Sequence, residues 1–291
     1  MEKLKILNGT YVLPLSVNYR GIFYNKRMLE KDGYQIPSTY AELIHTMQQI
    51  KKAGKLPIVF ADKDSWTIHQ GWDAIDMSSR GSQDNLFQNV LNGTTVLYED
   101  PIALDSTRKF LEIRQYGQKQ TINTGYDEAV KKFAKGEAYM FLQGNWAYPI
   151  IKKINPYMDL LFMPFPTYKE NQARVVAKID ATLGVSAFCK HPEAAEKFLD
   201  YVFSKNVSEY YANQAGAYSC IKSVDVADNY AKVFTDSISS GEFFLEEFAY
   251  ESEKSNARDA LFQNLTSSPQ TYTERAFLKE WNDLLILQKG A

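Results

Sequence analysis

Residues 133–151, FAKGEAYMFLQGNWAYPII, decide how the chain is organised. Gly136 ends an amphipathic helix, because glycine adopts the left-handed conformation after a helix at little cost. Residues 138–142 are apolar and too few for a helix of their own, so they predict a buried strand. The polar turn at 143–145 then brings Trp146 to the end of that strand.

Trp146 has two interpretations at this stage. An indole at a strand end, beside the side-chain amides of Gln143 and Asn145, suits a sugar. The apolar C–H face of a sugar stacks on the ring, while its hydroxyl groups need hydrogen-bond donors and acceptors. Alternatively, Trp146 begins a helix and belongs to the core.

A second stretch of the same kind lies earlier in the chain. Residues 55–60 predict a short buried strand, and the polar loop at 61–66 carries Asp64 and Trp66. Each of two predicted strands is therefore followed by a polar loop with an indole.

The order of the elements indicates an α/β fold. Strands that alternate with helices predict parallel βαβ units, whose ligands bind beyond the carboxyl ends of the strands. Both indole loops lie at such ends. Further strands are predicted at 160–165 and 181–188. Helices are predicted at 26–32, 40–53, 81–95, 101–116 and 126–135, from Pro192, and over most of the chain after 225. The helix at 40–53 follows a capping box of Thr39 and Glu42, and the helix from Pro192 has Ala195, Phe198, Leu199 and Val202 as its apolar face.

The composition is that of an ordinary globular protein of 291 residues, with 45% hydrophobic and 23% charged residues. A net charge of -2 argues against nucleic acid or an anionic membrane as a partner. The first residues lack the apolar segment of a signal peptide. Cys189 and Cys220 indicate free thiols or one bridge, and no metal site.

Motifs for catalysis or cofactor binding are absent: the chain has no GxGxxG, Walker, HExxH or GxSxG motif. The acidic pairs Asp62/Asp64 and Glu246/Glu247 are the candidates for glycosidase carboxylates. We expect both pairs to be solvated at the surface. The sequence therefore predicts no enzyme and no cofactor, with a glycosidase at Asp62 or Asp64 as the competing hypothesis.

Four segments together carry a family resemblance: 11–44 (YVLPLSVNYRGIFYNKRMLEKDGYQIPSTYAELI), 135–151 (KGEAYMFLQGNWAYPII), 163–168 (MPFPTY) and 191–202 (HPEAAEKFLDYV). In this order they resemble the family 1 extracellular solute-binding proteins, the carbohydrate receptors of ABC importers, with maltose-binding protein as the familiar relative. The resemblance extends over essentially the whole chain.

The resemblance implies a fold of the type II periplasmic-binding-protein kind, with two lobes that close on a sugar. Three hinge crossings are expected near 15–20, 162–167 and 219–223. The implied division is a first-lobe remnant and crossing at 1–18, the second lobe at 19–164, a further part of the first lobe at 165–219, and C-terminal helices on the second lobe at 220–291.

The resemblance also assigns ligand-binding residues. Trp146 matches the tryptophan that stacks on the sugar, and Asn18 matches a polar hinge residue that hydrogen-bonds it. Maltose-binding protein has a carboxylate at that position, so ligand preference should differ. The full predicted set is Trp146, Asn18, Asp64, Trp66, Asn145, Asp180 and Tyr19.

The implied function is the substrate-binding component of an ABC importer that binds an oligosaccharide and meets membrane permease subunits as a monomer. A full-length parent would be an extracellular lipoprotein or periplasmic. Family members begin with a signal sequence and several βα units, so we expect the first lobe here to be incomplete. A non-binding remnant of such a receptor and a peptide or polyamine receptor are the alternatives.

Overall fold

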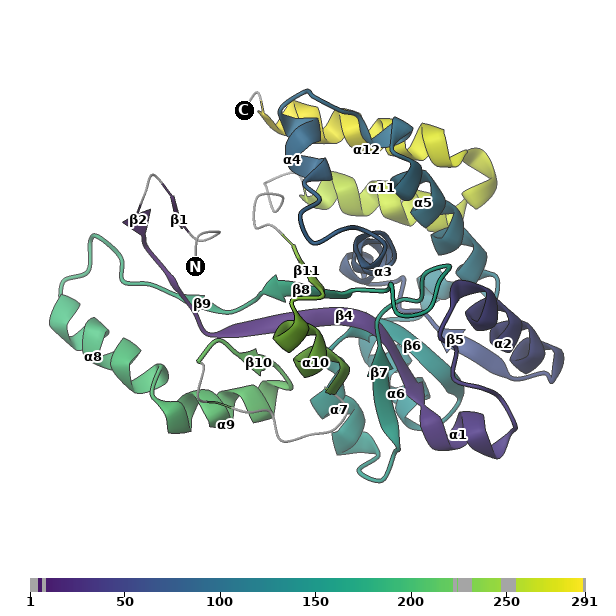
Figure 1. Cartoon of the computed structure of the whole chain (residues 1–291), viewed down its shortest axis with the longest axis horizontal. Helices are drawn as coiled ribbons and strands as arrows, with labels where there is room; N and C mark the ends of the chain where they lie inside the picture. The colour runs from purple at the N-terminus through teal and green to yellow at the C-terminus, as the bar shows by residue number, and fades with distance from the viewer. Residues whose placement is uncertain (1–4, 7–8, 222–223, 225–231, 247–254, 290–291) are drawn as a thin grey trace.

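The computed structural model describes residues 5–6, 9–221, 224, 232–246 and 255–289. Strand β4 (Ser16–Asn25) runs through the middle of the main sheet (Figure 1), whose order is β11-β8-β4-β6-β5, with β10 and β7 also paired to β4. These strands are β5 (Leu56–Val59), β6 (Ala138–Gly144), β7 (Leu160–Met163), β8 (Val175–Ile179), β10 (Tyr218–Ser219) and β11 (Phe243–Leu245).

Two small sheets lie beside the main one. They pair β1 (Lys5–Ile6) with β2 (Gly9–Thr10) and β3 (Leu13–Pro14) with β9 (Thr182–Leu183). The helices are α1 (Lys26–Lys31), α2 (Tyr40–Lys52), α3 (Ser65–Ser78), α4 (Leu86–Leu91), α5 (Pro101–Arg114), α6 (Tyr126–Ala134), α7 (Ala147–Ile154), α8 (Pro192–Val202), α9 (Lys205–Ala215), α10 (Lys232–Ser240), α11 (Ser255–Ser267) and α12 (Glu274–Lys289).

Strand β4 is buried on both faces, because helices cover each side of the sheet. Successive side chains of a strand point to opposite faces. Ile22 and Tyr24 therefore belong to the core shared with α2, α3, α5, α11 and α12, whereas Tyr19 and Phe23 belong to the core shared with α6 and α7. Figure 1 shows α4, α5, α11 and α12 stacked together on the α3 side.

The α/β class is confirmed, but the sheet is mixed rather than built of parallel units throughout. β5 pairs with β6, and β8 with β11, in parallel. β4 is antiparallel to β6, β7, β8 and β10. The alternation of strands and helices along the chain identifies βαβ units. It does not determine the direction of a strand such as β4, which pairs with strands from distant parts of the chain.

Predicted ends of two helices, α2 and α6, are confirmed. Thr39 and Glu42 form the capping box of α2, and Gly54 follows that helix with φ of +74°. Gly136 likewise follows α6 with φ of +74°. Strand β6 is confirmed as buried and extends to Gly144, two residues beyond the prediction.

Other predicted elements are wrong in extent. Residues 81–95 contain only the short helix α4, because Asp84 Oδ1 accepts a hydrogen bond from Leu86 N and holds a turn before it. The strand expected at 181–188 is reduced to β9, and β8 and β11 were not predicted. Residues 225–231 and 247–254, part of the predicted helical stretch, lie outside the described residues.

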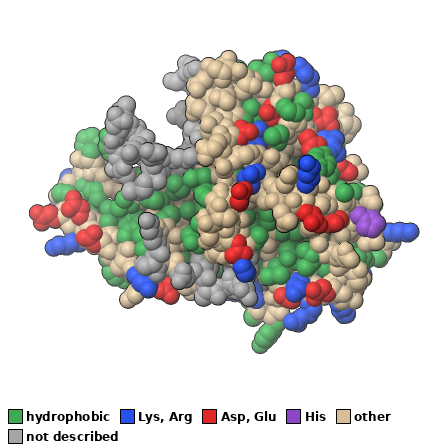
Figure 2. Space-filling model, viewed as in Figure 1, with side chains coloured by type: hydrophobic (Ala, Val, Ile, Leu, Met, Phe, Trp, Pro, Cys, Tyr) green, Lys and Arg blue, Asp and Glu red, His purple; other side chains and the backbone are tan. Residues whose placement is uncertain are grey.

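The helix from Pro192 is confirmed as α8, but its predicted apolar face is not buried. Ala195, Leu199 and Val202 are half-buried, and Phe198 is 58% exposed. Figure 2 shows hydrophobic side chains gathered over the left half of the molecule, where Figure 1 places α8, α9 and β9.

Both cysteines are free thiols, so the open choice between free thiols and a bridge is resolved. Among the described residues, none of the helices combines the length and apolar character needed to cross a membrane.

Candidate ligand-binding site

The carboxyl ends of β5 and β6 meet at one edge of the sheet, because the two strands are parallel neighbours. The loop after β5 leads to Asp64, which takes the N-cap position of α3. Asp64 Oδ2 accepts a hydrogen bond of 2.6 Å from the backbone N–H of Tyr126. This bond joins the start of α3 to the start of α6 beside the strand ends.

Trp66 and Trp146 come together at this edge, although 80 positions separate them in the sequence. Their ring centroids are 6.1 Å apart, and the ring of Tyr126 lies 5.1 Å from that of Trp66. All three side chains are half-buried. The structure thus places both predicted indole loops in one aromatic cluster, formed by Trp66, Trp146 and Tyr126.

Gly144 determines where the Trp146 ring lies. A Cβ atom at Gly144 would come within 2.1 Å of that ring. The ring therefore lies against the backbone at the end of β6, and only glycine leaves room for it there.

The aromatic cluster contains unused polar atoms. Within the described part of the chain, neither Trp146 Nε1 nor the Tyr126 hydroxyl has a hydrogen-bond partner, although both atoms are buried. Burial raises the pKa of Tyr126, so its hydroxyl stays protonated and able to donate. Buried polar atoms without partners carry a free-energy cost, which a ligand with hydroxyl groups would remove.

Asn145 lies beneath the cluster and is fully buried. Its Oδ1 accepts from the backbone N–H of Tyr19 at 2.7 Å, and its Nδ2 donates to Gly216 O at 2.7 Å and to Asn18 Oδ1 at 3.1 Å. Each polar atom of this side chain is therefore used inside the protein, and its position favours a supporting role.

The remaining predicted residues lie along the start of β4. Asn18 is half-buried and is held by Asn145, so the polar hinge residue adjoins the end of β6. Tyr19 is only 1% exposed and stacks on Phe234, with ring centroids 4.3 Å apart. Asp180 is exposed and bonds through its backbone N–H to Ser16 O.

The first expected hinge crossing, at residues 15–20, lies at the start of β4 beside β8 and β10. Residues 17–20 pair with β8, and residues 16–17 pair with β10. Residues 162–163, from the second expected crossing, pair with β4 further along, at residues 22–23. Of the third predicted crossing, 222–223 lie outside the described residues.

The expectation that the acidic pairs are solvated is wrong for two of their residues. Asp62 is 1% exposed and lies 3.1 Å from Arg114, whose guanidinium packs 3.7 Å from the ring centroid of Phe110. Glu246 forms an ion pair with Arg20, and its side chain is 11% exposed. Glu247 is outside the described residues.

Arg20 is a residue that sequence reasoning missed. It is 5% exposed, and its guanidinium pairs with Asp73 of α3 at 3.1 Å and with Glu246 after β11. A buried charge needs such partners. The sequence signal for this buried ion pair was an arginine within an otherwise apolar predicted strand.

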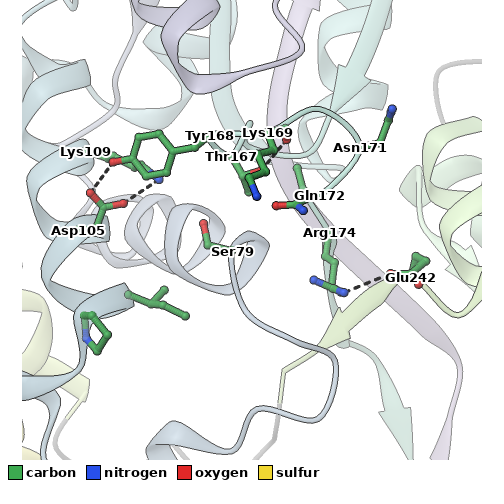
Figure 3. Close-up of a pocket in the computed structure, with 13 residues that line it drawn as sticks. Ser79, Asp105, Lys109, Thr167, Tyr168, Lys169, Asn171, Gln172, Arg174 and Glu242 are labelled. Carbon is green, nitrogen blue, oxygen red and sulfur yellow. Dashed lines mark hydrogen bonds and ion pairs between the residues drawn. The ribbon is translucent and has the colours of Figure 1, made fainter.

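A separate cavity of about 670 Å³ lies between α5, the end of α3 and residues 167–174 (Figure 3). Several of its charged side chains are paired: Asp105 accepts from Tyr168 at 2.6 Å and lies 2.9 Å from Lys109, and Arg174 lies 3.3 Å from Glu242. None of the predicted site residues lines it. Because both predicted indole loops and two buried polar atoms without partners among the described residues lie in the aromatic cluster, we take the cluster as the candidate site.

The mixed sheet and its flanking helices define a fold of the type II periplasmic binding proteins. The chain belongs to the bacterial extracellular solute-binding protein family, whose family model matches residues 2–209. This family consists of solute-binding proteins, not enzymes. The resemblance found in the sequence is thereby confirmed.

Known relatives are similar over most of this chain. It is 27% identical over 228 residues to the multiple sugar-binding protein of Streptococcus mutans, a match that covers 77% of this chain and 54% of that protein. The complex of the solute-binding protein RafE with raffinose has a TM-score of 0.84 at 23% identity, covering 99% of this chain and 76% of that one. Maltose-bound MalE3 of T. maritima has a TM-score of 0.75 at 16% identity, covering 98% and 74%.

The chain spans about half the length of the curated relatives that it matches. At identities of 16–23% the solved structures show the fold alone.

Proposed function

We propose that the chain serves as the sugar-binding component of an ABC importer and holds an oligosaccharide against Trp66 and Trp146. The observation that carries the proposal is the aromatic cluster, with two indoles 6.1 Å apart at the carboxyl ends of β5 and β6. The family and the multiple sugar-binding protein of Streptococcus mutans support it.

A sugar suits this cluster for a chemical reason. Its C–H faces stack on indole rings, and its hydroxyl groups both donate and accept hydrogen bonds. The unpartnered Trp146 Nε1 and Tyr126 hydroxyl supply donors beside the rings. We include Asn18 as a further polar contact, held in place by Asn145.

A cationic ligand such as a polyamine fits less well, because the nearby carboxylates are already engaged. Asp64 accepts from Tyr126 N–H, and Asp73 and Glu246 pair with Arg20. An ammonium group would therefore compete with these partners for each carboxylate.

In the proposed transport cycle, closure of two lobes around the start of β4 would present the loaded receptor to permease subunits in the membrane. The meeting of β4, β8 and β10 at residues 16–20 supports this place for the hinge.

The test is a thermal-shift assay and calorimetry with raffinose, stachyose, maltose and galactose. A ligand at a hundredfold its dissociation constant adds about 2.7 kcal/mol to stability. For a chain of this size the melting temperature should then rise by roughly 5–10 °C. A cooperative melt that none of the sugars moves, with no heat of binding, would contradict the proposal.

Trp146→Ala should weaken binding of the sugar that shifts the melt by about 1–3 kcal/mol, by analogy with bases that stack on aromatic side chains. Tyr157→Ala is the matched control, because Tyr157 is 86% exposed. Equal affinities of the Trp146 and Tyr157 variants would refute the assignment of the aromatic cluster.

A further inference from the structure

Helix α3 turns one side toward the candidate site. Trp66, Gln70 and Asp73 are spaced by four and three residues, so they lie on the same face of the helix. At one end of this face Trp66 contacts Trp146, and at the other end Asp73 lies 3.1 Å from Arg20.

The two ends of this face are close neighbours in the sheet. Arg20 is the register partner of Gly144, and Gly144 lies against the Trp146 ring. Gln70, midway between Trp66 and Asp73 along the face, therefore lies between the indole pair and Arg20.

Gln70 and Trp146 each hold one buried polar atom without a partner in the described part of the chain. These atoms are Gln70 Oε1, an acceptor, and Trp146 Nε1, a donor. They are opposite in hydrogen-bonding character, yet no bond joins them. Leaving both unpaired costs stability, unless a group from outside the chain supplies the missing donor and acceptor.

We infer that Gln70 is a specificity-determining residue that accepts a hydrogen bond from a ligand hydroxyl next to the stacked ring, while Trp146 Nε1 donates to an oxygen of the same ligand. The inference rests on the proposed sugar-binding function and adds a requirement to it. A hydroxyl group donates and accepts at once, so a ligand that carries one beside its stacking face pairs both atoms. A ligand that only stacks leaves Gln70 Oε1 unpaired and is disfavoured.

The first test measures affinity by calorimetry for the tightest-binding sugar among raffinose, stachyose, maltose and galactose. Gln70→Ala should weaken binding by about tenfold, the usual effect of one neutral hydrogen bond. Trp146→Phe keeps an aromatic ring but removes the donor, and it should weaken binding by a similar factor. Gln49→Ala, an exposed glutamine on α2, is the matched control and should bind as the unmodified chain does.

The second test distinguishes contact from an indirect effect. For the monodeoxy derivative that lacks the bonded hydroxyl, the unmodified chain and Gln70→Ala should bind equally, whereas the other derivatives should keep the tenfold difference. If Gln70→Ala weakens every derivative by the same factor, Gln70 acts only through structure and the inference is overturned.

The outcomes separate this inference from the proposed function. If the unmodified chain binds none of the sugars, both fail. If it binds one and Trp146→Ala loses it, while Gln70→Ala matches Gln49→Ala, the proposed function stands and the inference alone is overturned.

Discussion

Asn145 lies where three segments of the chain meet, and each polar atom of its side chain has a partner. Its amide joins the end of β6 to Tyr19 and Asn18 of β4 and to Gly216 before β10. Because the Asn145 side chain is fully buried, water does not replace these bonds when the side chain is removed. Asn145 therefore holds the strands that position Trp146.

Asn145→Ala should lower the free energy of unfolding by about 2–4 kcal/mol, since it removes the buried hydrogen bonds to the Tyr19 N–H and the Gly216 carbonyl. Urea unfolding followed by circular dichroism measures this change. Asn206→Ala, at an exposed position of α9, should stay within about 0.5 kcal/mol of the unmodified chain. Equal midpoints for the two variants would contradict the supporting role of Asn145.

At the scale of elements, α3 is held to α11 by a pair of side chains, a buried histidine and a half-buried aspartate. His69 of α3 places Nδ1 3.0 Å from Oδ1 of Asp259 in α11. Burial lowers the pKa of His69, and nearby Arg258 acts in the same direction, while the hydrogen bond to Asp259 opposes both. The imidazole is thus favoured in its neutral form in the folded chain.

A histidine with a lowered pKa binds its proton more weakly in the folded chain than in the unfolded chain. Its contribution to stability is present above the unfolded pKa of about 6.5 and is lost as the pH falls below that value. His69→Gln should flatten this dependence between about pH 7.5 and 5.5, as measured by the free energy of unfolding at each pH. His45→Gln, at an exposed position of α2, should leave the slope unchanged. An equal slope in the His69 variant would refute the account.

At the scale of the whole molecule, α8 and α9 project away from the main sheet (Figure 1). Large apolar side chains on these helices and just before α8 are exposed. Phe188 is 94% exposed, and Phe198, Tyr201 and Tyr210 are 58%, 64% and 68% exposed. Contiguous apolar patches of this kind favour association with other surfaces. The patch contrasts with the buried faces of α2, α3 and α5 around the main sheet.

The double variant Phe198→Ser, Tyr201→Ser should therefore keep the stability of the chain within about 1 kcal/mol and reduce its self-association. Sedimentation velocity over a range of concentrations measures association, and urea unfolding measures stability. Tyr157→Ser, an exposed aromatic on the turn after α7, controls for loss of an aromatic elsewhere. A large loss of stability would show that this face is packed in solution.

Features that depend only on residues adjacent in the sequence were predicted correctly. The capping box at Thr39, the helix-ending Gly136 and the buried strand before Trp146 are all confirmed. Caps, left-handed glycines and short apolar runs act within a few residues, so local chemistry is enough to define them. The strand ends that carry Trp66 and Trp146 follow from the same signals.

By itself, then, the sequence determined the α/β class, the family and the two loops that deliver indoles to strand ends. Only the tertiary structure decided that β4 is antiparallel to its neighbours, that Asp62 and Asn145 are buried, and that Phe198 is not. The physical reason is that strand pairing and burial depend on contacts between distant parts of the chain. A residue such as Asp62 has the same local pattern whether or not Arg114 lies beside it.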